Sequence, residues 1–304
     1  MTDPARIRSD IARRPDRPLG LPLADRPACP TLAIVSDDGV HQARLDKYFG
    51  WVDQWWVGLR DPFPLPEPGS SLAFDDEAAP PAARVSRFAA NALLTAVDHL
   101  HAARVMASDS LGPYAPFTVC RTALSSACEG VWLLTAPGRV ERVRRARLLH
   151  VEDEKGRQQS WSDVLNDESA VAAYPSERVS AEKEEVAGLL RWVDQQGRQL
   201  GKPRYSQTSC VRWVGALPSI SDPDNPLFGL ALMDQWRKLS AIAHDRAWVE
   251  ARRQGVVWTA RDANAGVMAT AATLEEFTDA FCSAALVTNE LVRHLDIRRK
   301  RYPL

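Results

Sequence analysis

The sequence lacks most of the features that would assign it to a chemical class. Its five cysteines are scattered and form no CxxC pair, which argues against a zinc ribbon and a disulfide framework. No apolar run is long enough to cross a bilayer, and the first residues do not resemble a secretory signal. The net charge is −1, so no global field favours nucleic acid or an anionic membrane. We therefore expect a cytoplasmic protein that binds no membrane, no metal and no other cofactor.

Familiar catalytic and phosphate-binding motifs are also missing. There is no HExxH and no GxSxG, and residues 197–202 lack the spacing and the Ser or Thr of a phosphate loop. His99 and His101 lie two residues apart on a predicted helix, about 200° around its axis, so they cannot share a metal ion. The carboxylates between 182 and 185 are typical of a solvated helix face.

What the sequence does contain is helical periodicity. Hydrophobic residues make up 45% of the chain and charged residues 25%, a balance that can form a packed core. Alternating strand patterns are missing, and residues 256–258 are at most a short strand, so we predict an all-α, irregular helical bundle. Thr273 and Glu276 have capping-box spacing at the start of the last helix. The other predicted helices span about 41–60, 84–108, 117–135, 139–159, 176–196 and 227–244, and residues 197–226 are predicted to be rich in loops.

The chain divides by composition into two parts. Residues 1–83 form a Pro-rich N-terminal extension that carries one aromatic-rich helix, at about 41–60, flanked by Pro-rich linkers. We expect this helix to dock on the main body, with its aromatic side chains packed into the core. Residues 84–304 form the helical domain proper.

Clusters of arginine and tryptophan leave alternatives open. Five arginines between 139 and 147 could grip phosphates from one helix face, or could simply be solvated beside nearby glutamates. Residues 298–301 form a second basic patch or a frayed tail. Cys120 and Cys128 are expected to be inert, buried thiols. Six tryptophans could line a small-molecule pocket or could fill the core: Trp51, Trp55, Trp56, Trp132, Trp236 and Trp248.

One short constellation on the helix at 227–244 could perform chemistry. Arg237 and His244 are seven residues apart, which is nearly two full turns, so both project from the same face, with Ser240 between them. A histidine that exchanges protons near neutral pH can remove the 2′-hydroxyl proton of RNA. An arginine can neutralise the charge that develops on the phosphate. The pair therefore suits phosphodiester cleavage in RNA without a metal ion.

This Arg-x6-His arrangement resembles the HEPN superfamily of all-helical proteins, whose ribonuclease members carry an Arg-x4–6-His motif near a helix end. Arg121 and Glu129, on one face of the predicted helix 117–135, add to a likeness with uncharacterised bacterial members. The resemblance covers about residues 84–296 in helix order. It implies a homodimer whose two motifs face one cleft, acting as a metal-independent endoribonuclease of a defence or stress system. Arg237 and His244 would be the catalytic pair, and Arg121, Glu129 and Ser240 would organise the site or contact substrate.

One departure from the family pattern, and one structural alternative, keep other interpretations open. Lys238 follows the arginine, where active members of the superfamily usually carry Asn, Asp or His. His244 could instead satisfy carbonyls at a helix C-terminus, and Arg237 could pair with Asp234, Asp245 or Glu129. The alternatives are therefore a non-catalytic interaction or regulatory module, or a small-molecule binder with a Trp-lined pocket.

Overall fold

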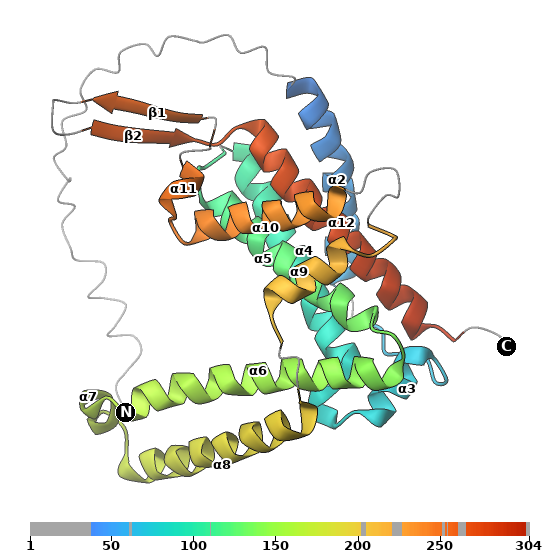
Figure 1. Cartoon of the computed structure of the whole chain (residues 1–304), viewed down its shortest axis with the longest axis vertical. Helices are drawn as coiled ribbons and strands as arrows, with labels where there is room; N and C mark the ends of the chain where they lie inside the picture. The colour runs from blue at the N-terminus through green and yellow to red at the C-terminus, as the bar shows by residue number, and fades with distance from the viewer. Residues whose placement is uncertain are drawn as a thin grey trace. The chain divides into compact units, whose positions relative to one another are not determined.

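Helices dominate the structure, as predicted, and pack as an irregular bundle (Figure 1). The computed structural model describes residues 38–60, 63–109, 111–201, 205–220, 227–250, 253, 255–260 and 266–301. Among these residues, no helix is both long and apolar enough to span a membrane. The helices are α2 (Asp38–Gly58), α3 (Ser71–Ala78), the 3-10 helix η1 (Pro81–Ala83), α4 (Val85–Asp109), α5 (Ala115–Leu134), α6 (Arg139–Leu165), α7 (Glu168–Ala172), α8 (Ser176–Leu200), α9 (Gln207–Gly215), α10 (Phe228–Ala243), α11 (Ala247–Glu250) and α12 (Leu274–Arg299).

A single β-hairpin interrupts the helices in the described part of the chain. Strand β1 (Gly255–Ala260) pairs antiparallel with β2 (Gly266–Ala271), and the two strands meet only each other. The short strand expected at 256–258 lies within β1. Because this hairpin joins no larger sheet, the architecture remains that of a helical bundle.

Helix α5 forms the centre of the bundle, with α4, α9, α10 and α12 packed around it (Figure 1). Its small residues allow this close packing: a Cβ atom on Gly130 would lie only 2.7 Å from the Leu291 side chain of α12. Phe117 and Leu124 of α5 are fully buried, as are Phe277 and Phe281 of α12. The long apolar stripes predicted from periodicity therefore meet on α5.

The described part of the predicted N-terminal extension packs into this bundle. Leu45 and Val52 of α2 are buried in the same core as the later helices. Phe49 meets Phe281 edge to face, with ring centroids 4.9 Å apart, and Trp56 stacks on His101 at 4.3 Å. The aromatic-rich helix therefore docks on the main body, and the unit that contains it begins at Asp38. Residues 1–37 lie outside the described residues.

Several helix ends follow their sequence signals, and others do not. Thr273 Oγ1 accepts a hydrogen bond from the Glu276 backbone at 3.1 Å, completing the predicted capping box of α12. Helix α8 does not stop at Gly197, as predicted, but continues to Leu200. Gly201 ends it with a φ of +62°, a conformation that glycine adopts without steric cost. Helix α9 lies in the segment 197–226, which was predicted to be rich in loops.

Two of the five arginines between 139 and 147, Arg142 and Arg145, are buried, so they are neither solvated nor free to bind phosphates. Arg142 forms two hydrogen bonds with the fully buried Asp75 of α3, at 2.6 and 2.8 Å. The Arg145 guanidinium lies 4.6 Å from the Trp132 ring and 4.2 Å from the Trp213 ring. Both alternatives offered by the sequence are therefore wrong for these two residues. Arg145 also pairs with Glu141, one turn earlier, at 3.2 Å. Asp75 and Trp213 are distant in the sequence, so helix periodicity could not reveal these partners.

The basic segment at 298–301 is not a frayed tail. Arg298 is partly buried and donates to Ser71 Oγ at 3.3 Å, and the backbone N–H of Arg301 donates to Glu67 at 2.8 Å. Arg299 and Lys300 both pair with Asp296, one turn earlier on α12. The end of α12 is therefore fastened to the segment around α3.

Candidate functional site

The predicted catalytic segment lies on α10, which packs along α5. Arg121 Nε of α5 donates a hydrogen bond to Ser240 Oγ at 3.0 Å. One turn earlier on α10, Trp236 Nε1 donates to Ser125 Oγ at 3.2 Å. Arg121 and Ser125, one turn apart on α5, thus contact residues one turn apart on α10. These two hydrogen bonds fix the rotation of α10 about its axis.

Glu129 lies one turn beyond Ser125 on α5, but its partner is not on α10. Its carboxylate accepts a hydrogen bond from the hydroxyl of Tyr205, a residue just before α9. Burial raises the pKa of Glu129, and the hydrogen bond from Tyr205 opposes this rise only in part. Burial also raises the pKa of Tyr205, so its hydroxyl remains a donor at neutral pH. Glu129 therefore organises the α5–α9 contact and does not pair with Arg237.

His244 is the C-cap of α10, but its side chain does not cap the helix. The backbone N–H of Arg246 donates to the Ala241 carbonyl at 2.9 Å, and that of Asp245 donates to the Ile242 carbonyl at 3.2 Å. Asp245 has a φ of +49°, so this ending is a Schellman motif closed by the backbone. The carbonyls that His244 could have capped, in the structural alternative, are thus already bonded. Its imidazole is exposed to solvent.

Arg237 is also exposed, and it pairs with none of its expected partners. Asp234 instead binds Lys238, with Nζ and Oδ2 2.8 Å apart. Glu129 is bonded to Tyr205, as described above. Within the described part of the chain, neither Arg237 nor His244 has a hydrogen bond or an ion pair from its side chain. Both are therefore available to a ligand, on the same side of α10 as Ser240.

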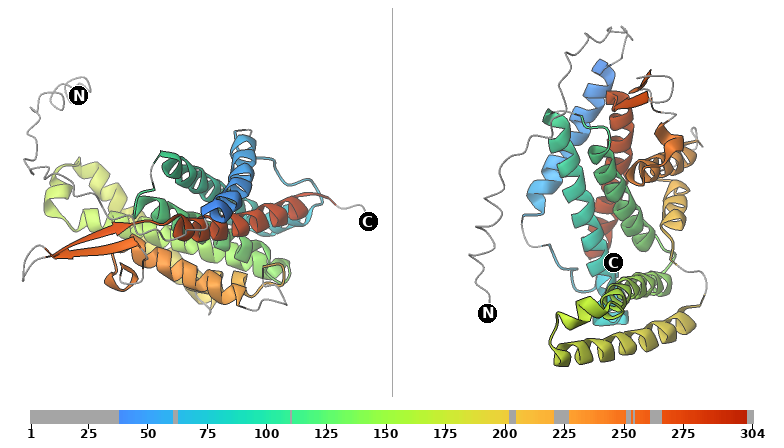
Figure 2. Two further views of the ribbon diagram at one scale, coloured as in Figure 1. Left: turned by 90° about the horizontal axis from the view of Figure 1, so that it is seen from above. Right: turned by 90° about the vertical axis from the view of Figure 1, so that its left-hand side faces the viewer.

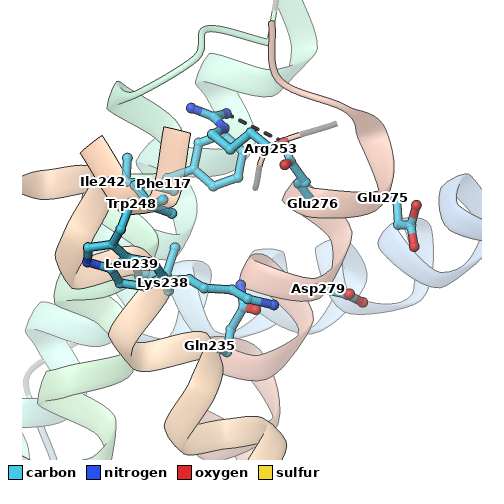
Figure 3. A pocket seen from close by; sticks show the side chains of 11 residues that line it. Phe117, Gln235, Lys238, Leu239, Ile242, Trp248, Arg253, Glu275, Glu276 and Asp279 are labelled. Atoms are coloured by element: carbon cyan, nitrogen blue, oxygen red, sulfur yellow. Dashed lines mark ion pairs between the residues drawn. The ribbon is translucent and has the colours of Figure 1, made fainter. Parts of the chain in front are cut away.

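A pocket opens beside α10 (Figure 3). Its volume is about 170 Å³, and it lies between α10, α11, the start of α5 and the start of α12. Phe117, Leu239 and Ile242 form an apolar wall, while Arg253 and Glu276 form an ion pair at one end with a separation of 3.5 Å. Sequence reasoning missed this pocket because its residues come from four separate segments.

Arg237 and His244 do not line this pocket. Each lies two residues after a pocket residue, Gln235 or Ile242, and two residues correspond to about 200° around a helix. The Arg237–His244 surface and the pocket are therefore two separate candidate sites on one helix.

The tryptophans do not gather around one cavity. Trp51 packs against Tyr48 and Trp55, and Trp56 stacks on a histidine of α4. Trp132 and Trp236 make the interhelical contacts described above. Of the six, Trp248 alone lines the α10–α12 pocket. Trp132 belongs to the core and Trp55, Trp56 and Trp236 pack against it, whereas Trp248 is 44% exposed. The core-filling interpretation therefore holds for these four residues and not for Trp248.

The described cysteines and histidines do not form a metal site. Cys120, Cys128, Cys210 and Cys282 are buried and unpaired with one another. Burial raises the pKa of Cys282 to about 11, and it also raises the pKa of the other three thiols, which opposes formation of reactive thiolates. Across the described ranges, no three metal-binding side chains come together.

Comparison with known proteins gives no family. No protein-family model, no curated protein sequence and no solved structure matches this chain.

Proposed function

We propose that the protein is a HEPN-like, metal-independent endoribonuclease, with Arg237 and His244 as its catalytic pair. The observation that carries the proposal is that both side chains project from one exposed side of α10 without a partner in the described part of the chain. Ser240 lies between them and is held by Arg121. Exposed side chains without a partner, on one side of a helix, support the proposal.

The chemistry follows from the two side chains. His244 accepts the proton of a ribose 2′-hydroxyl, and the 2′-oxygen attacks the adjacent phosphorus. Arg237 neutralises the charge that builds on the phosphate oxygens in the transition state. The bond from phosphorus to the 5′-oxygen then breaks, and this oxygen takes up a proton. The products are a 2′,3′-cyclic phosphate and a 5′-hydroxyl end.

The proton for the leaving oxygen requires an acid, and a single chain supplies one histidine at this site. In a homodimer with two such surfaces facing one RNA strand, the second copy's His244 would be that acid. This arrangement agrees with the HEPN resemblance and gives the exposed surface of α10 a role.

The test is cleavage of a labelled, mixed-sequence single-stranded RNA by the full chain in the presence of EDTA. We expect products with 2′,3′-cyclic phosphate ends, and no cleavage of DNA of the same sequence, because DNA has no 2′-hydroxyl. His244→Ala and Arg237→Ala should each lower the rate by roughly 100-fold or more, in line with the loss of a general base or of charge stabilisation.

Controls separate catalysis from folding. Arg84→Ala removes an exposed arginine far along the chain and should leave the rate unchanged. Because both catalytic side chains are exposed, their alanine variants should also unfold at the wild-type temperature. Cleavage that persists in His244→Ala would refute the assignment, as would a folded wild-type protein that leaves every RNA intact.

The pocket beside α10 favours a second candidate function, which is binding of a small molecule. Its volume of about 170 Å³ is below the range of roughly 300–1,000 Å³ typical of drug-sized ligands, so its occupant would be compact. An apolar wall beside an ion pair suits an amphipathic molecule. Thermal unfolding in the presence of free amino acids and small aromatic acids tests this function. Ile242→Trp, which would fill the pocket, should abolish any stabilisation that these ligands produce.

A further inference from the structure

The long hairpin of α6, α7 and α8, residues 139–200, extends away from the bundle and is here named the α6–α8 arm (Figures 1 and 2). Helix α6 has 27 residues and α8 has 25, so the arm is about 40 Å long at 1.5 Å per residue. Its root is fixed to the bundle by the Arg142–Asp75 ion pair and by Arg145 between two tryptophans. The two helices pack along each other towards α7.

The outer half of the arm buries very little apolar surface. Every buried side chain of α6 lies between residues 142 and 151, and none follows. On α8, only Val186 and Leu200 are buried. Tyr174 is 40% exposed, and Trp161, Val164 and Leu165 are only partly buried. Two helices alone cannot enclose an apolar core, so this half of the arm has apolar surface available for a partner.

Charge is distributed unevenly along the arm. The outer half, residues 152–188, contains ten Asp or Glu residues and four Lys or Arg residues. The inner half, residues 139–151 and 189–200, contains seven arginines and two carboxylates. Of these arginines, Arg142 and Arg145 are buried. Exposed arginines such as Arg139, Arg191 and Arg198 still leave the inner half positive.

This uneven distribution of charge along the arm favours one kind of partner. We propose that the arm is a dimerisation element, and that two copies pack their arms antiparallel as a four-helix bundle around a two-fold axis. In this arrangement, the acidic outer half of each arm lies on the basic inner half of the other. Such an interface is self-complementary, as a two-fold axis requires. Parallel pairing would instead place like charges side by side, which is unfavourable.

Sedimentation velocity of the full chain tests the proposal. We expect a dimer at micromolar concentration that weakens as salt is raised, because salt screens exposed charges. The outer pair of substitutions is Glu177→Lys with Glu184→Lys, and the inner pair is Arg191→Glu with Arg198→Glu. All four side chains are exposed, so the variants should fold normally. The outer pair changes the net charge of the outer half from −6 to −2, and the inner pair changes that of the inner half from +5 to +1. Each variant alone should therefore form a weaker dimer than the wild type.

Mixing the two variants is the decisive step. An equimolar mixture should favour a heterodimer over either homodimer, since the unchanged basic inner half of one variant then lies on the unchanged acidic outer half of the other. As a matched control, Arg60→Glu with Arg84→Glu changes exposed charges of the bundle and should leave the dimer intact. A wild-type chain that stays monomeric at low salt overturns the proposal. So does a dimer that neither pair of substitutions weakens, because its interface then lies elsewhere.

Crosslinking tests the antiparallel direction. Gly188 is near the middle of α8, and the space around its Cα is open. In an antiparallel pair, the midpoints of the two arms lie together and their tips lie about 40 Å apart. Gly188→Cys should therefore be joined to its second copy by a short bismaleimide, whereas Ala173→Cys at the tip should not. The reverse result would overturn the antiparallel arrangement.

Discussion

Removing the carboxylate of Asp75 should destabilise the protein far more than removing a carboxylate from an exposed ion pair with similar distances. Asp75 is fully buried and receives hydrogen bonds of 2.6 and 2.8 Å from Arg142, whose side chain is 8% exposed. Arg139 lies 3.9 Å away, and Arg298 donates to the neighbouring Ser71. Burial, followed by the charge of Arg142, lowers the pKa of Arg298, whereas Asp75 opposes this shift. Without Asp75, a cluster of arginines would lose its counter-charge.

The expected loss for Asp75→Ala is about 3–5 kcal/mol, the usual cost of leaving one member of a buried ion pair alone. For a domain of this size, that loss corresponds to a melting temperature lower by roughly 6–20 °C. Urea unfolding followed by tryptophan fluorescence and circular dichroism measures the free energy. Asp75→Ala combined with Arg142→Met should be less destabilising than Asp75→Ala alone, because no buried arginine is stranded at position 142.

The matched control is Glu185→Ala. Glu185 pairs with Arg157 at 2.7 Å, but both side chains are about half exposed, and exposed pairs contribute only about 0–1 kcal/mol. If Asp75→Ala cost no more than Glu185→Ala, the argument that burial sets the strength of the Asp75 contact would be refuted.

Three further predictions concern single positions. Glu129→Gln should raise the melting temperature at pH 8, and this gain should shrink towards pH 4. Burial raises the pKa of Glu129, so the folded state holds the proton more tightly, and wild-type stability falls as pH rises above the ordinary carboxyl value; a gain that is largest in acid would contradict this sign. Gly229→Ala should destabilise by about 1–3 kcal/mol in urea unfolding, because its Cβ would lie 2.3 Å from the Gly215 carbonyl oxygen. As a control, Gly188→Ala, in open space on α8, should instead stabilise the protein by roughly 0.5–1 kcal/mol. If both substitutions changed the free energy of unfolding equally, the steric explanation would be excluded. Thr273→Ala removes the cap of α12 and should cost about 1 kcal/mol in the same assay, whereas an unchanged midpoint would show that the cap is dispensable.

The candidate site was predictable in part. The spacing of Arg237 and His244 places both on one side of a helix, because that relation depends on helical geometry alone. Whether they are buried or exposed depends on what packs against α10. That outcome follows from Arg121 bonding Ser240 across 119 residues of sequence separation, and from a Schellman motif that leaves the His244 side chain unused.

By itself, the amino-acid sequence determined the helical class, most helix positions and the cap of α12. These features depend on residues a few positions apart, whose periodicity and hydrogen-bonding are local. Tertiary structure decided the rest: the burial of Arg142 and Arg145, the pocket beside α10, and an arm with exposed apolar surface. Each of these depends on contacts between residues far apart in the chain. A local pattern cannot specify such contacts, because many distant partners fit the same helical face equally well.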